Sequence, residues 1–428
     1  MTLSWAQIAR LGLVQMALGA IVVLTTSTLN RLMVVEFALP AVLPGALVGL
    51  HYGIQLSRPK WGYTSDTGGN RTRWIIGGMA VLAMGGFGAA LAVTLFASSY
   101  TLALSLSVLA YALIGLGVGA SGTSLLALLA TATAPHRRAA AATITWLMMI
   151  FGIAMTAGVA GSFLDPYSPS RLLTVVAVVV LAAFALTILA VGRIESQVTA
   201  CKPQPDVPFM DGLREIWAEP KARNFTLFIF LSMNAYFMQE LILEPYAGLV
   251  FGFTPGQSTT LSGAQNGGVF LGMLTVGIAA TGFKLGSLRS WVIGGCLGSA
   301  VMLVLISMAG LGSLPVPLTP LVSGLGFFNG MFAVAAIGSM MALASDGRES
   351  REGTRMGLWG AAQAVAAGFG GLTGAAAVDV LRASMTDEAA FGAVFTFEAL
   401  IFVAAAAMAL RILNTSFAPP RAALVPGE

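Results

Sequence analysis

Charged residues are scarce in this sequence. Only 9% of the 428 residues are Asp, Glu, Lys or Arg, whereas 57% are hydrophobic and the mean hydropathy is +0.85. A water-soluble domain carries about 25% charged residues, and a soluble fold of this size could not hide so much apolar surface. The composition therefore excludes a water-soluble protein and indicates a chain that folds in a lipid bilayer.

Cysteine and histidine are also rare, with two of each. Cys201 falls in a polar stretch and Cys296 in an apolar one, so the sequence shows no disulfide or metal framework. It shows no Ser/His/Asp arrangement, phosphate-binding loop or cluster of metal ligands either, and we predict that the protein is not an enzyme. The net charge of +4 comes from basic residues scattered among short loops. We interpret them as topology signals rather than as a nucleic-acid-binding surface.

Long apolar segments are what the sequence has in abundance. Each exceeds the roughly 17 residues needed to cross about 30 Å of hydrocarbon. The first is preceded by Arg10, and no small-residue cleavage site leads from it into a soluble domain, so we expect it to be retained as a helix. We therefore predict an all-α membrane protein with twelve transmembrane helices, at approximately 11–35, 38–57, 74–97, 101–130, 139–164, 171–192, 224–252, 258–282, 291–313, 318–344, 356–381 and 390–413.

Lys and Arg fall almost entirely on one side of these segments. If the amino terminus is cytoplasmic, all 22 of them except Arg31, Arg171 and Arg382 lie on the cytoplasmic side. The positive-inside rule then places both termini in the cytoplasm.

The two halves of the chain repeat each other. Three motifs recur in order, 213 to 218 residues apart, which chance similarity between Gly-rich helices does not readily produce. We predict two pseudo-symmetric six-helix halves, 1–192 and 224–428, joined by a cytoplasmic linker at 193–223. Parallel six-helix repeats are the major facilitator architecture. The matched motifs are Leu43-Pro44-Gly45-Ala46 with Leu261-Ser262-Gly263-Ala264, Arg73-Trp74-Ile75-Ile76 with Ser290-Trp291-Val292-Ile293, and Arg138 with Trp146 against Arg351 with Trp359.

The linker and the loop after the second segment carry the main polar signals. Asp211 to Arg223 has the apolar spacing of a short helix at the membrane surface, with a solvated linker as the alternative. The loop resembles the signature of the major facilitator superfamily, in which an Asp faces a neighbouring helix end and latches the cytoplasmic ends of the halves together. The alternative is a basic turn. The signature residues are Gly62, Asp66, Gly69, Arg71 and Arg73.

A closer resemblance follows from combined motifs spread over nearly the whole chain. They resemble the PucC/LhaA family, the bacteriochlorophyll-delivery branch of the major facilitators, and within it the member encoded among bacteriochlorophyll biosynthesis genes. The motifs are Asn30-Arg31-Leu32-Met33-Val34-Val35-Glu36, Leu50-His51-Tyr52, Arg58-Pro59-x-Trp61-Gly62-Tyr63-x-Ser65-Asp66-Thr67-Gly68-Gly69, Leu243-Glu244-Pro245-Tyr246 and Leu358-Trp359-Gly360-Ala361-x-Gln363-Ala364.

This resemblance implies a function and a setting. The protein would handle newly made bacteriochlorophyll, as cargo or bound pigment, in the cytoplasmic or intracytoplasmic photosynthetic membrane of a bacterium. Its partners would be light-harvesting or reaction-centre polypeptides, with bacteriochlorophyll synthase as a further candidate. Two alternatives stay open: a proton-coupled secondary transporter of a small solute, and a pigment-free scaffold for pigment-synthesis enzymes.

Four charged residues are expected towards the periplasmic side, Arg31 and Glu36 in the first segment and Glu240 and Glu244 in the seventh. These segments are symmetry mates, so an ion pair of Arg31 with Glu240 or Glu244 would join the halves. The alternative is that the charges simply reach headgroup water. Glu398 lies further inside its segment and is the candidate for a buried carboxylate that serves proton coupling. The middles of segments 1, 4, 7 and 10 are mainly Gly, Ala, Leu, Met and Phe, which favours an apolar cargo or no cargo pathway.

His51 is the candidate magnesium ligand of a bound bacteriochlorophyll. A neutral imidazole can be an axial metal ligand. Gly45, Gly49 and Gly53 form a small-residue ridge that should pack on a neighbouring helix, and His51 points away from that ridge. We expect it to face the outer surface; the alternative is that it hydrogen-bonds a neighbouring helix or reaches the membrane interface.

Overall fold

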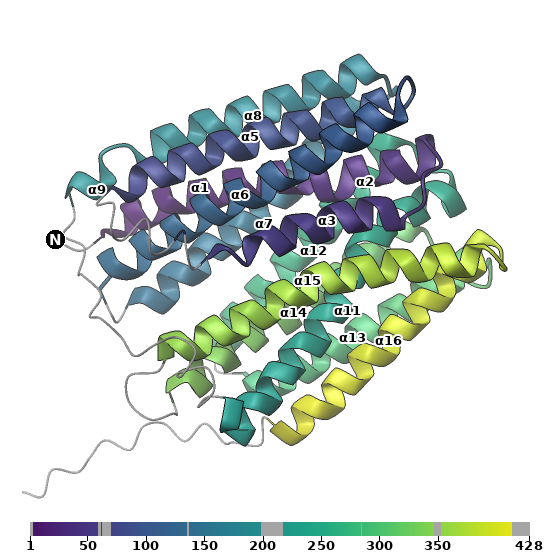
Figure 1. Cartoon of the computed structure of the whole chain (residues 1–428). Helices are drawn as coiled ribbons and strands as arrows, with labels where there is room; N and C mark the ends of the chain where they lie inside the picture. The colour runs from purple at the N-terminus through teal and green to yellow at the C-terminus, as the bar shows by residue number, and fades with distance from the viewer. Residues whose placement is uncertain are drawn as a thin grey trace, which may run out of the picture.

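The computed structural model describes residues 3–58, 61, 70–134, 137–197, 217–283, 285–345 and 352–412, and the structural statements below concern these residues. They form a bundle of long helices that cross the molecule in alternating directions (Figure 1). The described residues contain no strand. The bilayer explains this, because a helix satisfies every backbone hydrogen-bonding group within its own segment.

Six helical segments cross the first half. The first is one continuous rod from Trp5 to Glu36 in which α-helix alternates with two π-helical stretches, η1 and η2. The elements are α1 (Trp5–Val23), η1 (Leu24–Thr28), α2 (Leu29–Arg31), η2 (Leu32–Glu36), α3 (Val42–Gln55), α5 (Arg71–Leu95), α6 (Tyr100–Ala132), α7 (Arg138–Leu164), α8 (Pro169–Val191) and the short α9 (Ile194–Gln197).

The second half has the same number of crossings. Its elements are α11 (Pro220–Phe251), α12 (Pro255–Gly277) with η4 (Ile278–Gly282), α13 (Leu288–Gly310), α14 (Leu318–Ser345), α15 (Glu352–Arg382) and α16 (Asp387–Ile412). Each of the twelve predicted segments coincides with one of these crossings, so the predicted all-α fold is confirmed. Most of the linker lies outside the described residues, and so do residues 211–216 of the predicted surface helix, whereas residues 220–223 begin α11.

Ten of the described helices are long and apolar enough to span a membrane. The other two are α3, which has 14 residues, and α12, whose first half is rich in Gln, Ser and Thr. Along the chain each lies between two of the ten spans, and both pack within the bundle (Figure 1). The helix α1 begins, and α16 ends, at one end of the bundle, which we call the terminal end. The opposite end carries Glu36, Asp165 and Asp379.

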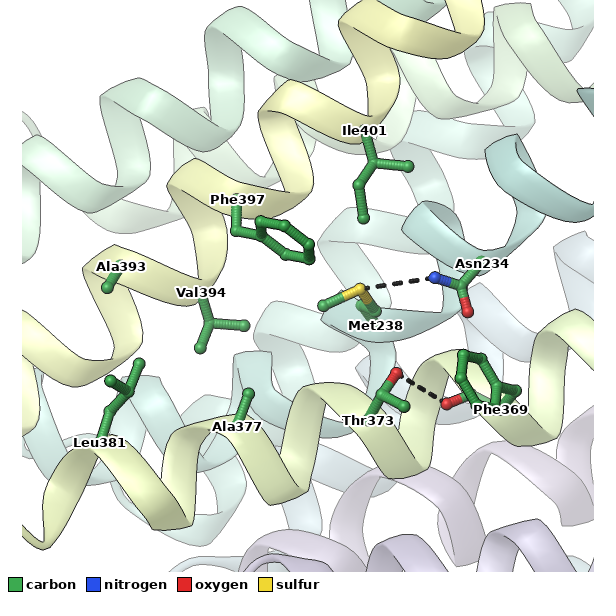
Figure 2. Close-up of a pocket in the computed structure, with 10 residues that line it drawn as sticks. All are labelled: Asn234, Met238, Phe369, Thr373, Ala377, Leu381, Ala393, Val394, Phe397 and Ile401. Atoms are coloured by element: carbon green, nitrogen blue, oxygen red, sulfur yellow. Dashed lines mark hydrogen bonds between the residues drawn. The ribbon is translucent and has the colours of Figure 1, made fainter.

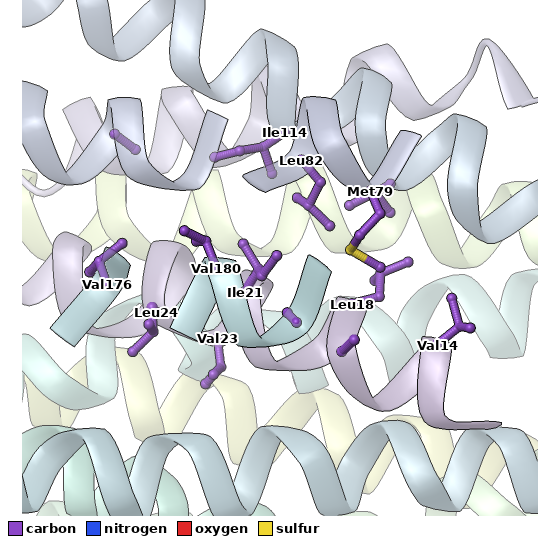
Figure 3. Packing of buried hydrophobic residues seen from close by; sticks show 14 of the residues in the cluster. Val14, Leu18, Ile21, Val23, Leu24, Met79, Leu82, Ile114, Val176 and Val180 are labelled. Atoms are coloured by element: carbon purple, nitrogen blue, oxygen red, sulfur yellow. The ribbon is translucent and has the colours of Figure 1, made fainter. Parts of the chain in front are cut away.

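Each half has its own apolar core. Figure 3 shows the core of the first half, where Leu18 and Ile21 of α1 face Met79 and Leu82 of α5, with Val180 of α8 beside Ile21. Between the halves, α7 packs against α12 and α15 packs against α3. The repeat makes α7 equivalent to α15 and α12 equivalent to α3, so one contact is made twice. Helices in lipid associate through close packing and hydrogen bonds rather than the hydrophobic effect. The polar groups between the halves are therefore expected to help hold the halves together.

Candidate functional site: the interface between the two halves

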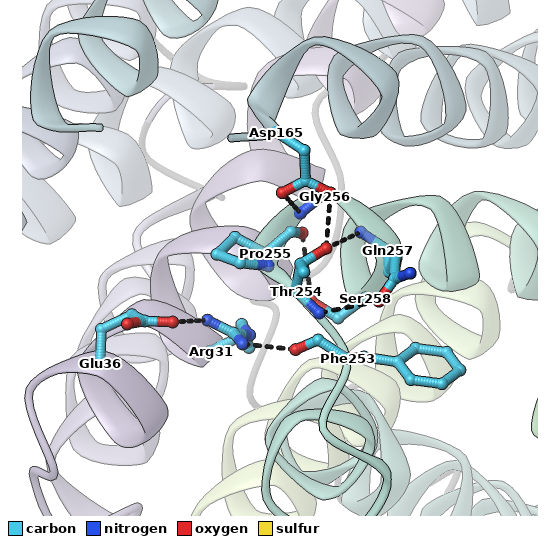
Figure 4. A network of polar contacts seen from close by, with 9 residues as sticks. All are labelled: Arg31, Glu36, Asp165, Phe253, Thr254, Pro255, Gly256, Gln257 and Ser258. Carbon is cyan, nitrogen blue, oxygen red and sulfur yellow. Dashed lines mark hydrogen bonds and ion pairs between the residues drawn. The ribbon is translucent and has the colours of Figure 1, made fainter. Parts of the chain in front are cut away.

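An aspartate after α7 joins the halves at the opposite end. Asp165 accepts hydrogen bonds from the backbone N–H of Gly256 at 3.1 Å and from the Thr254 hydroxyl at 2.5 Å (Figure 4). Thr254 is the N-cap of α12, and its hydroxyl also accepts from the backbone N–H of Gln257. The first N–H groups of a helix lack intrahelical partners and carry partial positive charge, so a carboxylate there is stabilising.

A second aspartate makes the equivalent contact from the other half. Asp379 of α15 accepts from the backbone N–H groups of Ala41 and Val42 at 2.9 and 2.7 Å, at the start of α3. Asp379 follows Asp165 by 214 residues, and Gly256 follows Val42 by the same number, within the range of the sequence repeat. We call these contacts the two aspartate latches. They occupy the end of the bundle opposite to the predicted Asp66 latch.

The first helix becomes π-helical where its composition becomes polar. The segment η1, Leu24–Thr28, carries four consecutive hydroxyl residues, all of them buried. The hydroxyls of Thr25 and Thr26 donate back to the Val22 carbonyl at 2.7 and 3.2 Å. Single-turn π-helical stretches inside α-helices are frequent at functional sites, and here Ser27 and Thr28 contact the other half.

Those two hydroxyls build what we call the interface cluster: Ser27, Thr28, Glu244, Thr259 and Ser262. Ser27 donates to the Glu244 carboxyl of α11 and lies 2.8 Å from the Ser262 hydroxyl of α12. Thr28 and Thr259 are hydrogen-bonded at 3.0 Å. Glu244 is only 2% exposed, and its Oε2 atom accepts no hydrogen bond from the described residues. The cluster therefore holds a buried carboxyl group between the halves with hydroxyls as its contacts.

Arg31 pairs within its own half, and the predicted ion pair with Glu240 or Glu244 is wrong in this structure. Its guanidinium contacts Glu36 at 2.5 Å and donates to the Phe253 carbonyl of the second half at 2.7 Å (Figure 4). Glu36 is five residues along the same rod and needs no movement of the halves to be reached. The alternative, free access to headgroup water, is wrong as well, because Arg31 and Glu244 are both buried.

Glu240 lies one helical turn before Glu244 on α11 and is partly buried. It is beside the Thr26 hydroxyl of the first half and near the Tyr236 and Tyr52 rings. A second carboxyl group thus faces the hydroxyl run of the first helix, nearer the middle of the bundle.

Glu398 lies inside the core of the second half, on α16. It is 0% exposed, and among the described residues neither of its oxygens has a hydrogen-bond partner. It contributes no described contact between the halves, and its role in proton coupling stays a prediction.

His51 is buried, and its predicted exposure on the outer surface is wrong. Only 2% of it is exposed. Its Nε2 atom accepts a hydrogen bond from Gln55 at 2.8 Å, and Gln55 in turn accepts from Arg58. His51 does avoid the ridge that packs on α15, but α6 covers its side of α3, where Gly115 approaches the His51 carbonyl. His51 does not line the cavity described below, and its role as a magnesium ligand stays a prediction.

The signature loop is described only at its end. Gly62, Asp66 and Gly69 lie outside the described residues, so the predicted Asp66 latch is untested. Arg71 begins α5 and is buried, whereas Arg73 is exposed. The backbone N–H of Arg71 donates to Glu195 of α9 at 2.8 Å, a contact within the first half.

A cavity of about 380 Å³ lies on the flank of the second half, between α11, α15 and α16 (Figure 2). Its rim includes the exposed rings of Phe369 and Phe397, so it opens on the outer surface of the bundle. Apolar side chains make up most of the lining. Asn234 is a polar residue deep in this lining. It is 8% exposed, and its Oδ1 atom has no partner among the described residues. The volume is within the roughly 300–1,000 Å³ typical of small-molecule sites.

Sequence analysis missed the interface cluster and both aspartate latches. The signal for the first was the run Thr25 to Thr28 inside an apolar segment, which a mean hydropathy averages away. The signal for the second was the 214-residue spacing of Asp165 and Asp379, two acidic residues at equivalent places in the repeat.

Comparison with known proteins gives a family for this architecture. The family described as "PUCC protein" matches residues 28–417. The "Bacteriochlorophyll synthase 44.5 kDa chain" of Rhodobacter capsulatus is 66% identical over 430 residues, which is all of both chains. "Protein PucC" of Cereibacter sphaeroides is 29% identical and the alignment covers 97% of this chain and 94% of that protein.

Solved structures with the same fold are membrane transporters. A bacterial homologue of the lysosomal transporter Spinster aligns with a TM-score of 0.67 at 16% identity, over 96% of both chains. The peptide transporter POT aligns with a TM-score of 0.71 at 15% identity, over 95% of this chain and 94% of that one. These likenesses confirm the predicted major facilitator fold. The match over most of the chain also confirms the predicted family: this chain belongs to the PUCC family.

Proposed function

We propose that the protein binds bacteriochlorophyll within the membrane and delivers it to light-harvesting or reaction-centre polypeptides as their complexes assemble. The family and the printed name of the 66% identical relative support a role in the bacteriochlorophyll context. The protein would hold pigment rather than make it, because its structural neighbours are transporters. We further propose that it resides in the inner or intracytoplasmic membrane with both termini in the cytoplasm, as the distribution of Lys and Arg indicates.

One structural observation carries this proposal: the cavity between α11, α15 and α16 opens sideways from the bundle. A pigment with a large apolar surface is dissolved in the bilayer, so it reaches a protein from the lipid side rather than from water. The apolar lining suits such a molecule, and the buried Asn234 amide offers it one polar contact. Few precisely placed polar groups in an apolar pocket are the usual arrangement of a ligand site.

The test is purification of the full chain in mild detergent from a pigment-making host, followed by absorption spectroscopy. We expect near-infrared absorption from bacteriochlorophyll in stoichiometric amount. Ala377→Trp fills the cavity from α15 and should reduce the bound pigment, whereas Ala182→Trp on the exposed face of α8 should not. A wild-type protein that is colourless would overturn the proposal. Equal amounts of bound pigment in both variants would support the proposed function but would place the pigment site outside this cavity.

A proton-coupled secondary transporter is the second candidate, because Glu240 and Glu244 face the other half from the same helix. A colourless protein that accumulates solute in proteoliposomes under a proton gradient would favour it. A colourless protein that co-purifies bacteriochlorophyll synthase or other pigment enzymes, and moves no solute, would favour the pigment-free scaffold.

A further inference from the structure

The interface between the halves holds more acidic than basic groups. Glu36 and Glu244 lie near one guanidinium, that of Arg31, and Glu240 is a third carboxyl group one turn before Glu244. Arg31 is committed to Glu36 and to the Phe253 carbonyl. Glu240 and Glu244 are therefore left without a bonded cation among the described residues.

The groups around Glu244 are neutral on almost every side. From the first helix it meets Ser27, and from α12 it meets the hydroxyls of Ser258 and Ser262. Arg31 lies over Gly248, one turn further along α11, so it attracts Glu244 without bonding to it. Near Glu240 are Tyr236 of the same helix and Tyr52 of α3, and Arg58 lies beyond Tyr52, hydrogen-bonded to Gln55.

An ionised carboxylate in such a place is costly. Burying an isolated charge is unfavourable by many times the worth of a hydrogen bond, so buried carboxylates are paired, metal-bound or neutralised by a proton. Ser27 supplies one hydrogen bond to Oε1, and Oε2, equally buried, accepts none from the described part of the chain. The missing partner must be a positive charge that the described residues do not provide.

We propose that Glu244 and the hydroxyls around it bind a monovalent cation, a proton or a sodium ion, between the two halves. The oxygens of Ser27, Ser258 and Ser262 are hard, neutral donors, which suit an alkali cation or a protonated carboxyl group. Among the described residues no group of three or more His, Cys, Asp or Glu side chains is placed for a transition metal. The irregular backbone of η1 fits this role, since helix interruptions at membrane depth are found where ions are coordinated.

This site has a consequence for the two halves. Glu244 belongs to the second half and Ser27 to the first, so the cation neutralises the group that joins them. When the cation leaves, the ionised carboxylate is costly to keep buried, so entry of water between the halves becomes favourable. Occupancy of the site is therefore coupled to the separation of the halves, whatever larger ligand the protein carries.

The experiment uses the full-length protein in detergent, with thermal unfolding measured in sodium chloride and in choline chloride at equal ionic strength. If sodium is the ligand, each tenfold rise in sodium above the dissociation constant raises the melting temperature by a constant increment. Glu244→Gln should abolish that increment. The matched control, Glu398→Gln, removes an equally buried carboxyl group outside the cluster and should keep it.

If the ligand is a proton, sodium has no effect, and infrared spectroscopy detects a protonated carboxyl band that disappears on raising the pH. That band should be lost in Glu244→Gln and retained in Glu398→Gln. Ser262→Ala is the milder variant if Glu244→Gln does not fold: it should shift the sodium midpoint or the titration midpoint without abolishing either. The proposal is overturned if the wild type shows neither a sodium-dependent increment nor a titrating band assigned to Glu244. Neither readout involves pigment, so the result is independent of the function proposed above.

Discussion

The two ends of the interface differ in how closely the halves approach. On α3, a Cβ atom added at Gly45 would lie 3.1 Å from the Cβ of Ala375, and at Gly49 the nearest atom would be 3.9 Å away. At Gly53, nearest the terminal end, no atom of the described residues would lie within 4 Å. These glycines share one face of α3, so α3 and α15 diverge towards the terminal end.

The symmetry-related pair behaves in the same way. A Cβ atom at Gly263 of α12 would lie 2.6 Å from the backbone nitrogen of Gly158, whereas at Gly267, one turn nearer the terminal end, it would meet nothing within 4 Å. The described hydrogen bonds between the halves also lie between Ser27 and the opposite end. Hydrogen bonds and backbone contact therefore join the halves at the opposite end, whereas looser apolar packing holds the described part of the terminal end.

The largest effect is expected where backbones touch. Gly263→Val places a side chain against the Gly158 backbone, which cannot yield without moving α7, and should destabilise by about 1–3 kcal/mol or more. Gly267→Val puts the same side chain on the same helix face in open space and should cost far less. Thermal unfolding of the two purified variants decides the matter, and equal melting temperatures would remove the proposed difference between the ends.

Arg31→Gln should have the next largest effect. It removes the charge-assisted bonds to Glu36 and Phe253, and a hydrogen bond to a charged group contributes about 1.5–3 kcal/mol. A double-mutant cycle with Glu36→Gln should show non-additive losses of stability, whereas one with Glu244→Gln should be closer to additive. The reverse result would mean that Arg31 pairs with the second half in the membrane.

The two aspartate latches should act alike. Asp165→Ala and Asp379→Ala each remove a cap from a helix N-terminus, at about 0.5–2 kcal/mol each, and the double variant should lose the sum because the latches share no residue. Cysteines introduced at the opposite end should become more reactive towards a water-soluble thiol reagent. Unchanged reactivity in the double variant would show that the latches stabilise helices without closing that end.

His51→Phe should have the smallest effect, because its contact lies within one half. Losing the bond to Gln55 costs about 0.5–1.5 kcal/mol, and the co-purified pigment should keep its amount and spectrum. Absorption spectroscopy and thermal unfolding of the same sample measure both. Loss of pigment with retained stability would support His51 as the magnesium ligand.

The sequence predicted the crossings of the bundle well because the bilayer imposes length and apolarity on each one. The repeat predicted the two halves because equivalent positions, such as Trp146 and Trp359, recur at a fixed spacing. Pairings of individual side chains were less accessible. Arg31 has acidic residues within reach in both halves, and only the geometry of η2 selects Glu36.

The error at His51 has a different cause. The glycine ridge of α3 correctly located one neighbouring helix and left the opposite face unassigned, because a helical wheel says nothing about a second neighbour. That second neighbour is α6, and the imidazole is buried. The interface cluster was missed because a short run of hydroxyl residues hardly alters the mean hydropathy of a long span. Its partners also lie more than 200 residues away along the chain.

The reciprocity of the aspartate latches bears on how such a chain can be assembled. Asp165 caps α12 of the second half, and Asp379 caps the equivalent helix, α3, of the first half. The same pair of surfaces, an aspartate and a helix start, therefore meets twice, once in each direction. This is the isologous contact of a two-fold dimer. Two separate six-helix polypeptides already contain both members of the contact, and co-expressed fragments divided within the linker should reassociate without the covalent connection.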